Sequence, residues 1–142
     1  MNWIYDDGGR KAAGFKGSAR DCVARSIAIA SGRPYCEIYA ALAKGAGSER
    51  KSRGTSARNG IHVTRKWFKD YMRSIGFRWF PTMQIGSGCK VHLTDGELPM
   101  GRLVVAVSKH YTAVIDGVVY DNHDPHRVSG RCVYGHWIFD DE

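Results

Sequence analysis

The sequence predicts an α+β domain in which N-terminal helices pack on a C-terminal antiparallel β-sheet. Apolar residues recur at helical spacing in the first half of the chain, whereas the second half contains short runs of β-branched and aromatic residues. A length of 142 residues fits one domain, and 43% hydrophobic residues supply enough apolar surface for a core. This composition excludes a chain that is disordered throughout.

Three helices are expected after a glycine-rich, extended lead-in over residues 1–20. The first helix, over 22–31, has apolar or small residues on most sides and should be largely buried. The other two carry apolar residues at three- and four-residue spacing. Each helix has a residue suited to its start and a glycine suited to its end. The expected boundary pairs are Asp21 and Gly32, Pro34 and Gly45, and Thr64 and Gly76.

The whole formal net charge of +7 lies in one segment, residues 44–73, which holds nine basic and two acidic side chains. Residues 45–63 have no apolar period and many turn formers, so a mobile basic loop is expected there. Such a concentrated charge favours docking of one partner, an acidic protein or a nucleic acid, over coating of DNA. A solvated charged surface explains the same pattern. The candidate partner-binding residues are Arg50, Lys51, Arg53, Arg58, Lys66 and Lys69.

Strand patterns follow the third helix. Runs of β-branched and aromatic residues are bounded there by turn formers. The dipeptide Asp116-Gly117 lies between two of these runs and is typical of a two-residue hairpin turn. The expected strands are 77–82, 102–109, 110–115, 118–122 and 131–139, with a loop or short strand over 83–92.

Cys22 directly follows the expected cap of the first helix. Free backbone N–H groups and the helix dipole favour negative charge in a first turn, which lowers a thiol pKa from its usual value of about 8.5. A thiolate in that place is a ready nucleophile. A cysteine also packs well as a small apolar residue, so the position by itself admits a purely structural role.

A histidine and a carboxylate are expected close together across the hairpin. With a two-residue turn, side-chain alternation places His110, Thr112 and Asp121 on one face of the two strands. Diagonal neighbours have α-carbons about 7 to 8 Å apart, so the Asp121 carboxylate can reach the His110 imidazole and orient it. A three-residue turn would place Asn122 on that face instead. A half-buried strand histidine without a catalytic role fits the same local pattern.

The four cysteines lack the tight spacing of a disulfide framework, so reduced thiols are expected. Cys89 follows a Gly-rich loop and is an alternative nucleophile, although no clear helix begins after it. A zinc site is a second alternative, because two Cys–His pairs have spacings close to those of zinc ligands. Its ligands would be Cys89, His92, Cys132 and His136, with His123 and His126 as spares. The hairpin pair is preferred to both alternatives, so no metal and no cofactor are expected.

The order of the candidate residues resembles that of papain-like cysteine peptidases. A Cys opens a helix in DCVARSIAIASG, a His opens a strand in HYTAVIDG, and an Asp or Asn follows in VVYDN. This order is similar to that of the bacteriocin-processing peptidases in particular. The stretches 21–42 and 83–134 also look like those of uncharacterised small proteins from bacteria and their phages. The resemblance implies a single papain-like domain over 1–142, with a basic loop and helix inserted at about 45–75.

The resemblance also implies a role for each site residue. Cys22 would be the nucleophile, His110 the general base and acid, and Asp121 the orienting group of a hydrolase that cleaves peptide or isopeptide bonds without a cofactor. The family usually has a Gln six residues before the Cys to complete the oxyanion hole, and this chain has Lys at that position. The candidate oxyanion donors are Lys16, Ser18 and Gln84.

A non-catalytic binding protein is the alternative from a different functional class. Such a protein would use a papain-like scaffold to contact nucleic acid or an acidic protein through residues 44–73, because a fold does not fix a function. Salt-dependent binding of nucleic acid that disappears when Arg50, Lys51 and Arg53 are neutralised would favour this alternative.

A cytoplasmic location without membrane contact is expected. The sequence has no run of about 18 apolar residues, which a membrane-spanning helix needs. Its first eleven residues include acids and glycines in place of the basic and apolar stretches of a signal peptide.

Overall fold

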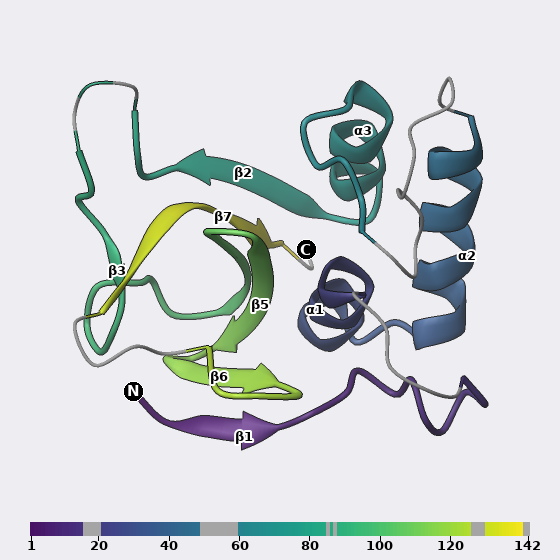
Figure 1. Cartoon of the computed structure of the whole chain (residues 1–142), viewed down its shortest axis with the longest axis horizontal. Helices are drawn as coiled ribbons and strands as arrows, with labels where there is room; N and C mark the ends of the chain where they lie inside the picture. The colour runs from purple at the N-terminus through teal and green to yellow at the C-terminus, as the bar shows by residue number, and fades with distance from the viewer. Residues whose placement is uncertain (16–20, 49–59, 85, 87, 126–129, 141–142) are drawn as a thin grey trace.

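The computed structural model describes residues 1–15, 21–48, 60–84, 86, 88–125 and 130–140 (Figure 1). Within these residues the chain forms three helices and a seven-stranded, mostly antiparallel sheet, which confirms the expected α+β class. The helices lie together on one side of the sheet (Figure 1). None of the helices in the described part of the chain is long and apolar enough to cross a membrane.

The three helices lie close to their expected positions: α1 spans Cys22–Ser31, α2 spans Tyr35–Gly47 and α3 spans Lys66–Ser74. Gly32 ends α1 in the left-handed conformation, with φ of 74°, as expected. Asp21 precedes α1, but its side chain makes no capping hydrogen bond. Asp21 therefore occupies the expected position before α1, while buried side chains engage its carboxylate.

The starts of α2 and α3 and the end of α2 differ from the expected residues. Pro34 is the residue before α2 instead of its first residue, α2 continues past Gly45, and Arg65 instead of Thr64 precedes α3. No side-chain cap fixes either start. At Gly45 a Cβ would lie 2.2 Å from the indole ring of Trp67, so the glycine allows α2 and the start of α3 to approach closely.

The sheet contains the expected strands and one that was not expected. The strands are β1 Trp3–Tyr5, β2 Phe77–Pro81, β3 His92–Leu93, β4 Arg102–Val107, β5 His110–Ile115, β6 Val118–Asp121 and β7 Arg131–Phe139. Their order is β1-β6-β5-β4-β7-β2, and β3 pairs separately with β7. Pairing is antiparallel except between β1 and β6. The sequence did not indicate β1 because the strand has only three residues and these show no alternation of apolar and polar side chains. All three residues are exposed.

The hairpin of β5 and β6 has the expected register. Val114 lies opposite Val119, and the two-residue turn Asp116-Gly117 joins the strands. Both turn residues have positive φ, 49° and 81°, as the tight hairpin turn requires. This register directs His110 and Asp121 toward each other at the open end of the hairpin.

Apolar side chains form two clusters, because successive residues of β4 point to opposite faces of the sheet. Val104 and Ala106 join the larger cluster, which lies between the helices and the sheet. The other buried members contributed by the helices include Ile27, Ile38, Leu42, Phe68 and Met72. The smaller cluster, on the other face, is purely aliphatic and contains Leu93, Leu103, Val105, Val107, Val114, Val119 and Val133.

The basic segment is described only in part. Residues 45–63 were expected to form a loop, but α2 extends into this range as far as Gly47. The side chains of Lys66 and Lys69 are exposed on α3, where Lys66 Nζ lies 2.7 Å from an Asp70 carboxylate oxygen. The remaining candidates for partner binding, Arg50, Lys51, Arg53 and Arg58, lie outside the described residues.

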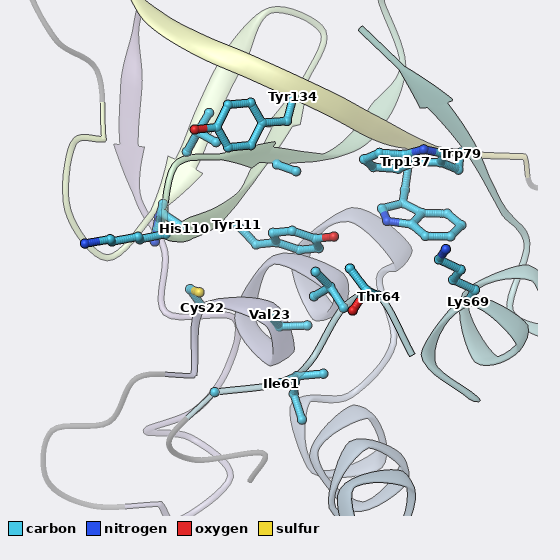
Figure 2. A pocket seen from close by; sticks show the side chains of 15 residues that line it. Cys22, Val23, Ile61, Thr64, Lys69, Trp79, His110, Tyr111, Tyr134 and Trp137 are labelled. Atoms are coloured by element: carbon cyan, nitrogen blue, oxygen red, sulfur yellow. The ribbon is translucent and has the colours of Figure 1, made fainter. Parts of the chain in front are cut away.

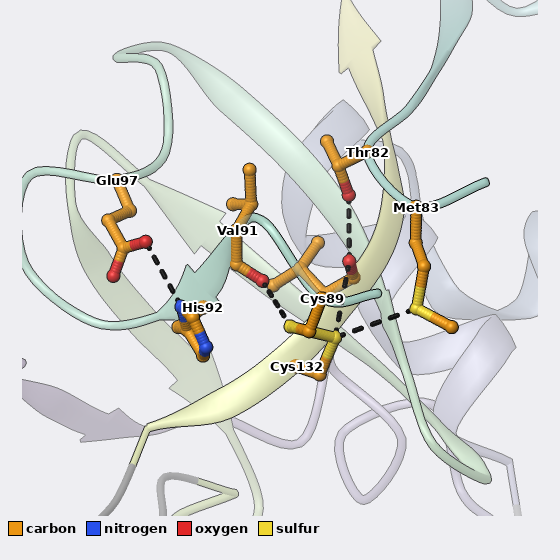
Figure 3. Close-up of a disulfide and its surroundings, with 8 residues drawn as sticks. Thr82, Met83, Cys89, Val91, His92, Glu97 and Cys132 are labelled. Atoms are coloured by element: carbon orange, nitrogen blue, oxygen red, sulfur yellow. Dashed lines mark hydrogen bonds and ion pairs between the residues drawn. A yellow bond between two sulfur atoms is a disulfide. The ribbon is translucent and has the colours of Figure 1, made fainter. Parts of the chain in front are cut away.

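A disulfide joins Cys89 and Cys132, so the expectation of four reduced thiols was wrong (Figure 3). β3 pairs with the start of β7 and places His92 opposite Cys132, which brings a loop cysteine beside a strand cysteine 43 residues later. Sequence spacing does not show this pairing, because it depends on a two-residue strand. Cys22 and Cys36 are the free cysteines of the described chain.

The disulfide also removes both alternatives that used these sulfur atoms. Cys89 has no free thiol to act as a nucleophile, and neither cysteine can supply a thiolate to zinc while the bond is intact. His92 contacts a different group, with Nδ1 lying 3.1 Å from a carboxylate oxygen of Glu97. The expected zinc ligands therefore do not form one site.

Candidate active site

Three segments bring Cys22, His110 and Asp121 together. Cys22 is the first residue of α1, which packs against β5, and His110 is the first residue of β5. Asp121 is the last residue of β6, the strand that pairs with β5. The sulfur of Cys22 and the ring of His110 face the same space between α1 and the sheet (Figure 2).

The Asp121 carboxylate orients the His110 ring. His110 Nε2 lies 2.7 Å from Asp121 Oδ2, and the hydroxyl of Thr112 donates to the same oxygen at 2.7 Å. Burial raises the pKa of Asp121, but hydrogen bonds from His110 and Thr112 and the charges of His110 and Arg25 outweigh it, so this pKa lies below its ordinary value. Asp121 therefore stays a carboxylate that accepts hydrogen bonds from its neighbours.

Asn122, which a three-residue turn would have placed beside His110, has a different contact. Its side-chain oxygen lies 2.7 Å from His123 Nδ1, and its backbone N–H donates to Asp121 Oδ1 at 2.7 Å. The orienting position beside His110 is therefore occupied by Asp121, in agreement with the two-residue turn.

Cys22 and His110 form a coupled acid–base pair. Burial raises the pKa of the Cys22 thiol, but a hydrogen bond and the positive charge from His110, the backbone N–H of Tyr111 and the charge of Arg25 hold it below its ordinary value. Burial lowers the pKa of His110, whereas its hydrogen bonds to Asp121 and Cys22 raise it to about 9. Both shifts act in the same direction, because each stabilises a Cys22 thiolate beside a His110 imidazolium.

Arg25 connects the site to a buried network of charged and polar groups. It forms an ion pair with Asp21, one helical turn away, and its Nη2 lies 3.6 Å from Asp121 Oδ1. Arg25 is 5% exposed and Asp121 3% exposed, so both charges lie in a poorly solvated region. Tyr35 donates a hydrogen bond to Asp21, and Arg10 donates to the Tyr35 hydroxyl at 3.1 Å. The residues that flank Cys22 are thus tied to the carboxylate of Asp121.

The backbone of Asp121 is held by the N-terminal strand. Its carbonyl oxygen accepts a hydrogen bond from the indole N–H of Trp3 at 3.1 Å and another from the backbone N–H of Asp6 at 2.9 Å. β1 pairs in parallel with β6 and ends opposite Asp121. The unexpected strand therefore supports a site residue.

An apolar pocket of about 570 Å³ opens beside Cys22 and His110 (Figure 2). Aromatic side chains from β2, β5 and β7 form much of its wall. The wall residues labelled in Figure 2 are Cys22, Val23, Ile61, Thr64, Lys69, Trp79, His110, Tyr111, Tyr134 and Trp137. Lys69 belongs both to this wall and to the basic segment, so that segment reaches the site through α3.

The candidate oxyanion donors are not brought to the pocket in the described part of the chain. Lys16 and Ser18 lie outside the described residues. Gln84 is exposed in the loop after β2 and is not part of the pocket wall. The backbone N–H of Cys22 lies in the first turn of α1, where N–H groups have no partner within the helix.

The sequence interpretation missed Arg25, Thr112 and the aromatic wall. For Arg25 a signal was present, since a single charged side chain in an otherwise apolar helix must find a buried partner. Thr112 was placed on the correct face without a role. The wall residues Trp79 and Tyr134 come from separate strands, and only the tertiary structure shows that they meet.

Comparisons with models of known protein families, with curated proteins and with solved structures found no match.

Proposed function

We propose that this protein is a papain-like cysteine hydrolase that cleaves peptide or isopeptide bonds in the cytoplasm. The observation that carries the proposal is one imidazole, that of His110, which hydrogen bonds to the Asp121 carboxylate and lines the same pocket as the Cys22 thiol (Figure 2). A nucleophile, a base within hydrogen-bonding reach and a group that orients the base are what nucleophilic acyl transfer requires. The resemblance in residue order supports the same assignment.

Each group has a defined task in the proposed reaction. The Cys22 thiolate attacks the carbonyl carbon, and the His110 imidazolium donates its proton to the leaving amine as the C–N bond breaks. The resulting thioester is cleaved by water, which gives one proton to His110 while the C–S bond breaks. Asp121 keeps the ring oriented through both steps. The backbone N–H of Cys22 donates to the oxygen that becomes negative.

The pocket and the basic segment fit a polypeptide substrate with acidic character. The aromatic wall can bury an apolar side chain next to the reacting bond. Lys69 in the wall and Lys66 on the same helix both belong to the segment that holds the net positive charge. We therefore propose that residues 44–73 dock an acidic protein or nucleic acid that brings the substrate to Cys22.

Cleavage of a mixed peptide library, followed by mass spectrometry, tests the proposal. The wild-type protein should cleave a subset of the peptides, and Cys22→Ala should abolish cleavage while the circular dichroism spectrum is retained. Cys36→Ala is the matched control, because Cys36 is a free thiol exposed on α2. An electrophilic peptide probe should modify Cys22 in preference to Cys36.

Two results would contradict the proposal. Cleavage that persists at the wild-type rate in Cys22→Ala would assign the activity to another group or to a contaminant. Salt-dependent binding of nucleic acid together with an absence of cleavage and of Cys22 labelling would favour the non-catalytic binding protein.

A further inference from the structure

A second histidine lies beside the His110–Asp121 pair. His123 follows β6, and its Nδ1 lies 3.8 Å from Asp121 Oδ1. The rings of His110 and His123 have centroids 4.9 Å apart. One ligand atom from each of His110, Asp121 and His123 can be chosen so that all three lie within 4.8 Å of one another. Two imidazoles and a carboxylate therefore converge on one small volume.

The proposed hydrolysis uses His110 and Asp121 but gives His123 no task. His123 is not part of the pocket wall, and its side chain is 54% exposed, so it can rotate to adjust a coordination geometry. His110 and Asp121 are 10% and 3% exposed and are fixed by their hydrogen bonds. The cluster thus combines two rigid ligands with one adaptable ligand at the surface.

We propose that a divalent transition-metal ion of the Zn²⁺ class binds His110 Nε2, the Asp121 carboxylate and His123, and reversibly inhibits the nucleophile Cys22. Imidazole nitrogen and carboxylate oxygen are common zinc ligands, with metal–ligand distances of about 2.0 to 2.2 Å. The binding site depends only on the three side chains. Its inhibitory consequence rests on the proposed function.

Inhibition follows from the atom of His110 to which the ion would bind, Nε2. A metal ion on Nε2 replaces the hydrogen bond that orients the His110 ring toward Cys22. The coordinated ring keeps a proton only on Nδ1, and loss of that proton would leave an imidazolate on the metal, so the ring becomes a poor acid toward a leaving amine. Binding releases the Nε2 proton to the solvent and forms no covalent bond to Cys22.

The groups around Asp121 indicate a metal ion that binds with moderate affinity and dissociates, instead of a permanent structural metal. Arg25 Nη2 lies 3.6 Å from Asp121 Oδ1, and its positive charge opposes a second cation at that carboxylate. Thr112 and the backbone N–H of Asn122 already donate to Asp121, so an ion must compete with these hydrogen bonds. We expect dissociation constants in the micromolar range, where changes in free metal would regulate the site.

Calorimetric titration of the full chain with zinc chloride, and cobalt chloride as a spectroscopic probe, tests binding without reference to catalysis. One ion should bind per chain, and His123→Ala should weaken binding at least tenfold. His92→Ala is the matched control, because His92 also contacts a carboxylate, Glu97, but lies on β3. Cys22→Ser should retain binding, and the cobalt complex should show no sulfur-to-metal charge-transfer band.

Alkylation of Cys22 in the presence and absence of zinc chloride tests inhibition. Zinc should slow alkylation at least tenfold in the wild-type protein and less than twofold in His123→Ala, each compared with its own metal-free rate. A chelator should restore the wild-type rate.

Equal zinc affinity in the wild-type protein and His123→Ala, or loss of binding in His92→Ala or Cys22→Ser, would overturn the metal site. Cleavage of peptides by a protein that binds no zinc would overturn this inference and leave the proposed function intact. His123-dependent zinc binding by a protein that cleaves no peptide would overturn the proposed function and leave the metal site intact.

Discussion

The candidate active site and the disulfide region both join distant segments of the chain, but they use different interactions. At the candidate site, buried charged groups on α1, β5 and β6 are held by hydrogen bonds and ion pairs, with Arg25, Asp121 and His110 at the centre. At the other region, a covalent bond joins the loop before β3 to β7, and a purely aliphatic cluster packs nearby. The first region is polar and buried, whereas the second is apolar and covalently closed.

This difference separates reactivity from stability. Buried charges are costly unless they are paired, but their protonation can change during a reaction. A disulfide constrains the unfolded chain without placing any charge in the interior. Changes in the first region should therefore alter both the stability of the fold and the chemistry of Cys22, whereas changes in the second should alter stability alone.

The largest effect is expected when His110 is removed. In His110→Ala the thiol of Cys22 loses the hydrogen bond and charge that lower its pKa, while burial still raises it. The fraction of thiolate at neutral pH should fall as this pKa rises, and we expect the alkylation rate of Cys22 to drop at least tenfold. Mass spectrometry of the Cys22 peptide measures the rate, with Cys36 in the same molecule as reference.

The pH dependence sharpens this prediction. His110 remains protonated up to its pKa of about 9 and its charge stabilises the Cys22 thiolate, so between pH 7 and 8.5 the alkylation rate of the wild-type Cys22 should rise less steeply than that of His110→Ala. In His110→Ala the rate should rise about tenfold per pH unit below the thiol pKa. An alkylation rate that rises equally steeply in both proteins would disprove the ion pair.

Removal of Arg25 should have the next largest effect. Arg25→Met leaves the buried carboxylates of Asp21 and Asp121 short of a partner, and loss of one member of a buried pair destabilises by about 3 to 5 kcal/mol. Urea unfolding measures this loss. Arg33→Met is the matched control, because Arg33 and Glu37 form an ion pair at the same spacing but are 41% and 49% exposed. A surface pair of that kind contributes about 0.5 kcal/mol or less, and equal losses in the two variants would contradict the buried network.

Loss of the disulfide should lower stability without changing the site. The double substitution Cys89→Ala and Cys132→Ala should lower the free energy of unfolding by about 2 to 4 kcal/mol. The alkylation rate of Cys22 should stay within twofold of the wild-type rate. Titration of thiols in the unreduced wild-type protein provides the direct check, and four reactive thiols in the denatured chain would show that the disulfide does not form.

A pair of threonines gives the smallest and most closely matched comparison. Thr112 donates to the buried Asp121 carboxylate at 2.7 Å, and Thr82, near the disulfide, donates to the carbonyl of Val133 at 2.8 Å (Figure 3). Hydrogen bonds to charged groups contribute more than neutral ones, so Thr112→Val should cost about 2 kcal/mol and Thr82→Val about 1 kcal/mol. Only Thr112→Val should lower the alkylation rate of Cys22. A similar rate change in Thr82→Val would show that the two regions are coupled.

Short-range patterns predicted the parts of the site that a single turn determines. The Asp116-Gly117 turn fixes the register of β5 and β6, so the approach of His110 to Asp121 followed from alternation alone. The start of α1 at Cys22 and its end at Gly32 also depend on neighbouring residues. These features need no knowledge of distant segments.

Long-range pairing accounts for what the sequence did not show. The Cys89–Cys132 bond depends on a two-residue strand that pairs with β7. The partner of Arg25 on β6 depends on how α1 packs against the sheet. Neither arrangement leaves a periodic signal, because each is determined by packing between segments far apart in the chain.

The parallel pairing of β1 with β6 places a folding constraint on the candidate site. Trp3 and Asp121 are 118 positions apart, and the Trp3 indole and the Asp6 backbone both hold the Asp121 carbonyl. Contacts of such large sequence separation form slowly, since the loop between them must close first. During synthesis, Trp3 emerges long before its partner, so a nascent chain cannot assemble the supported Asp121. The supported arrangement of His110 and Asp121 therefore forms only after β6 has been made and has paired with β1.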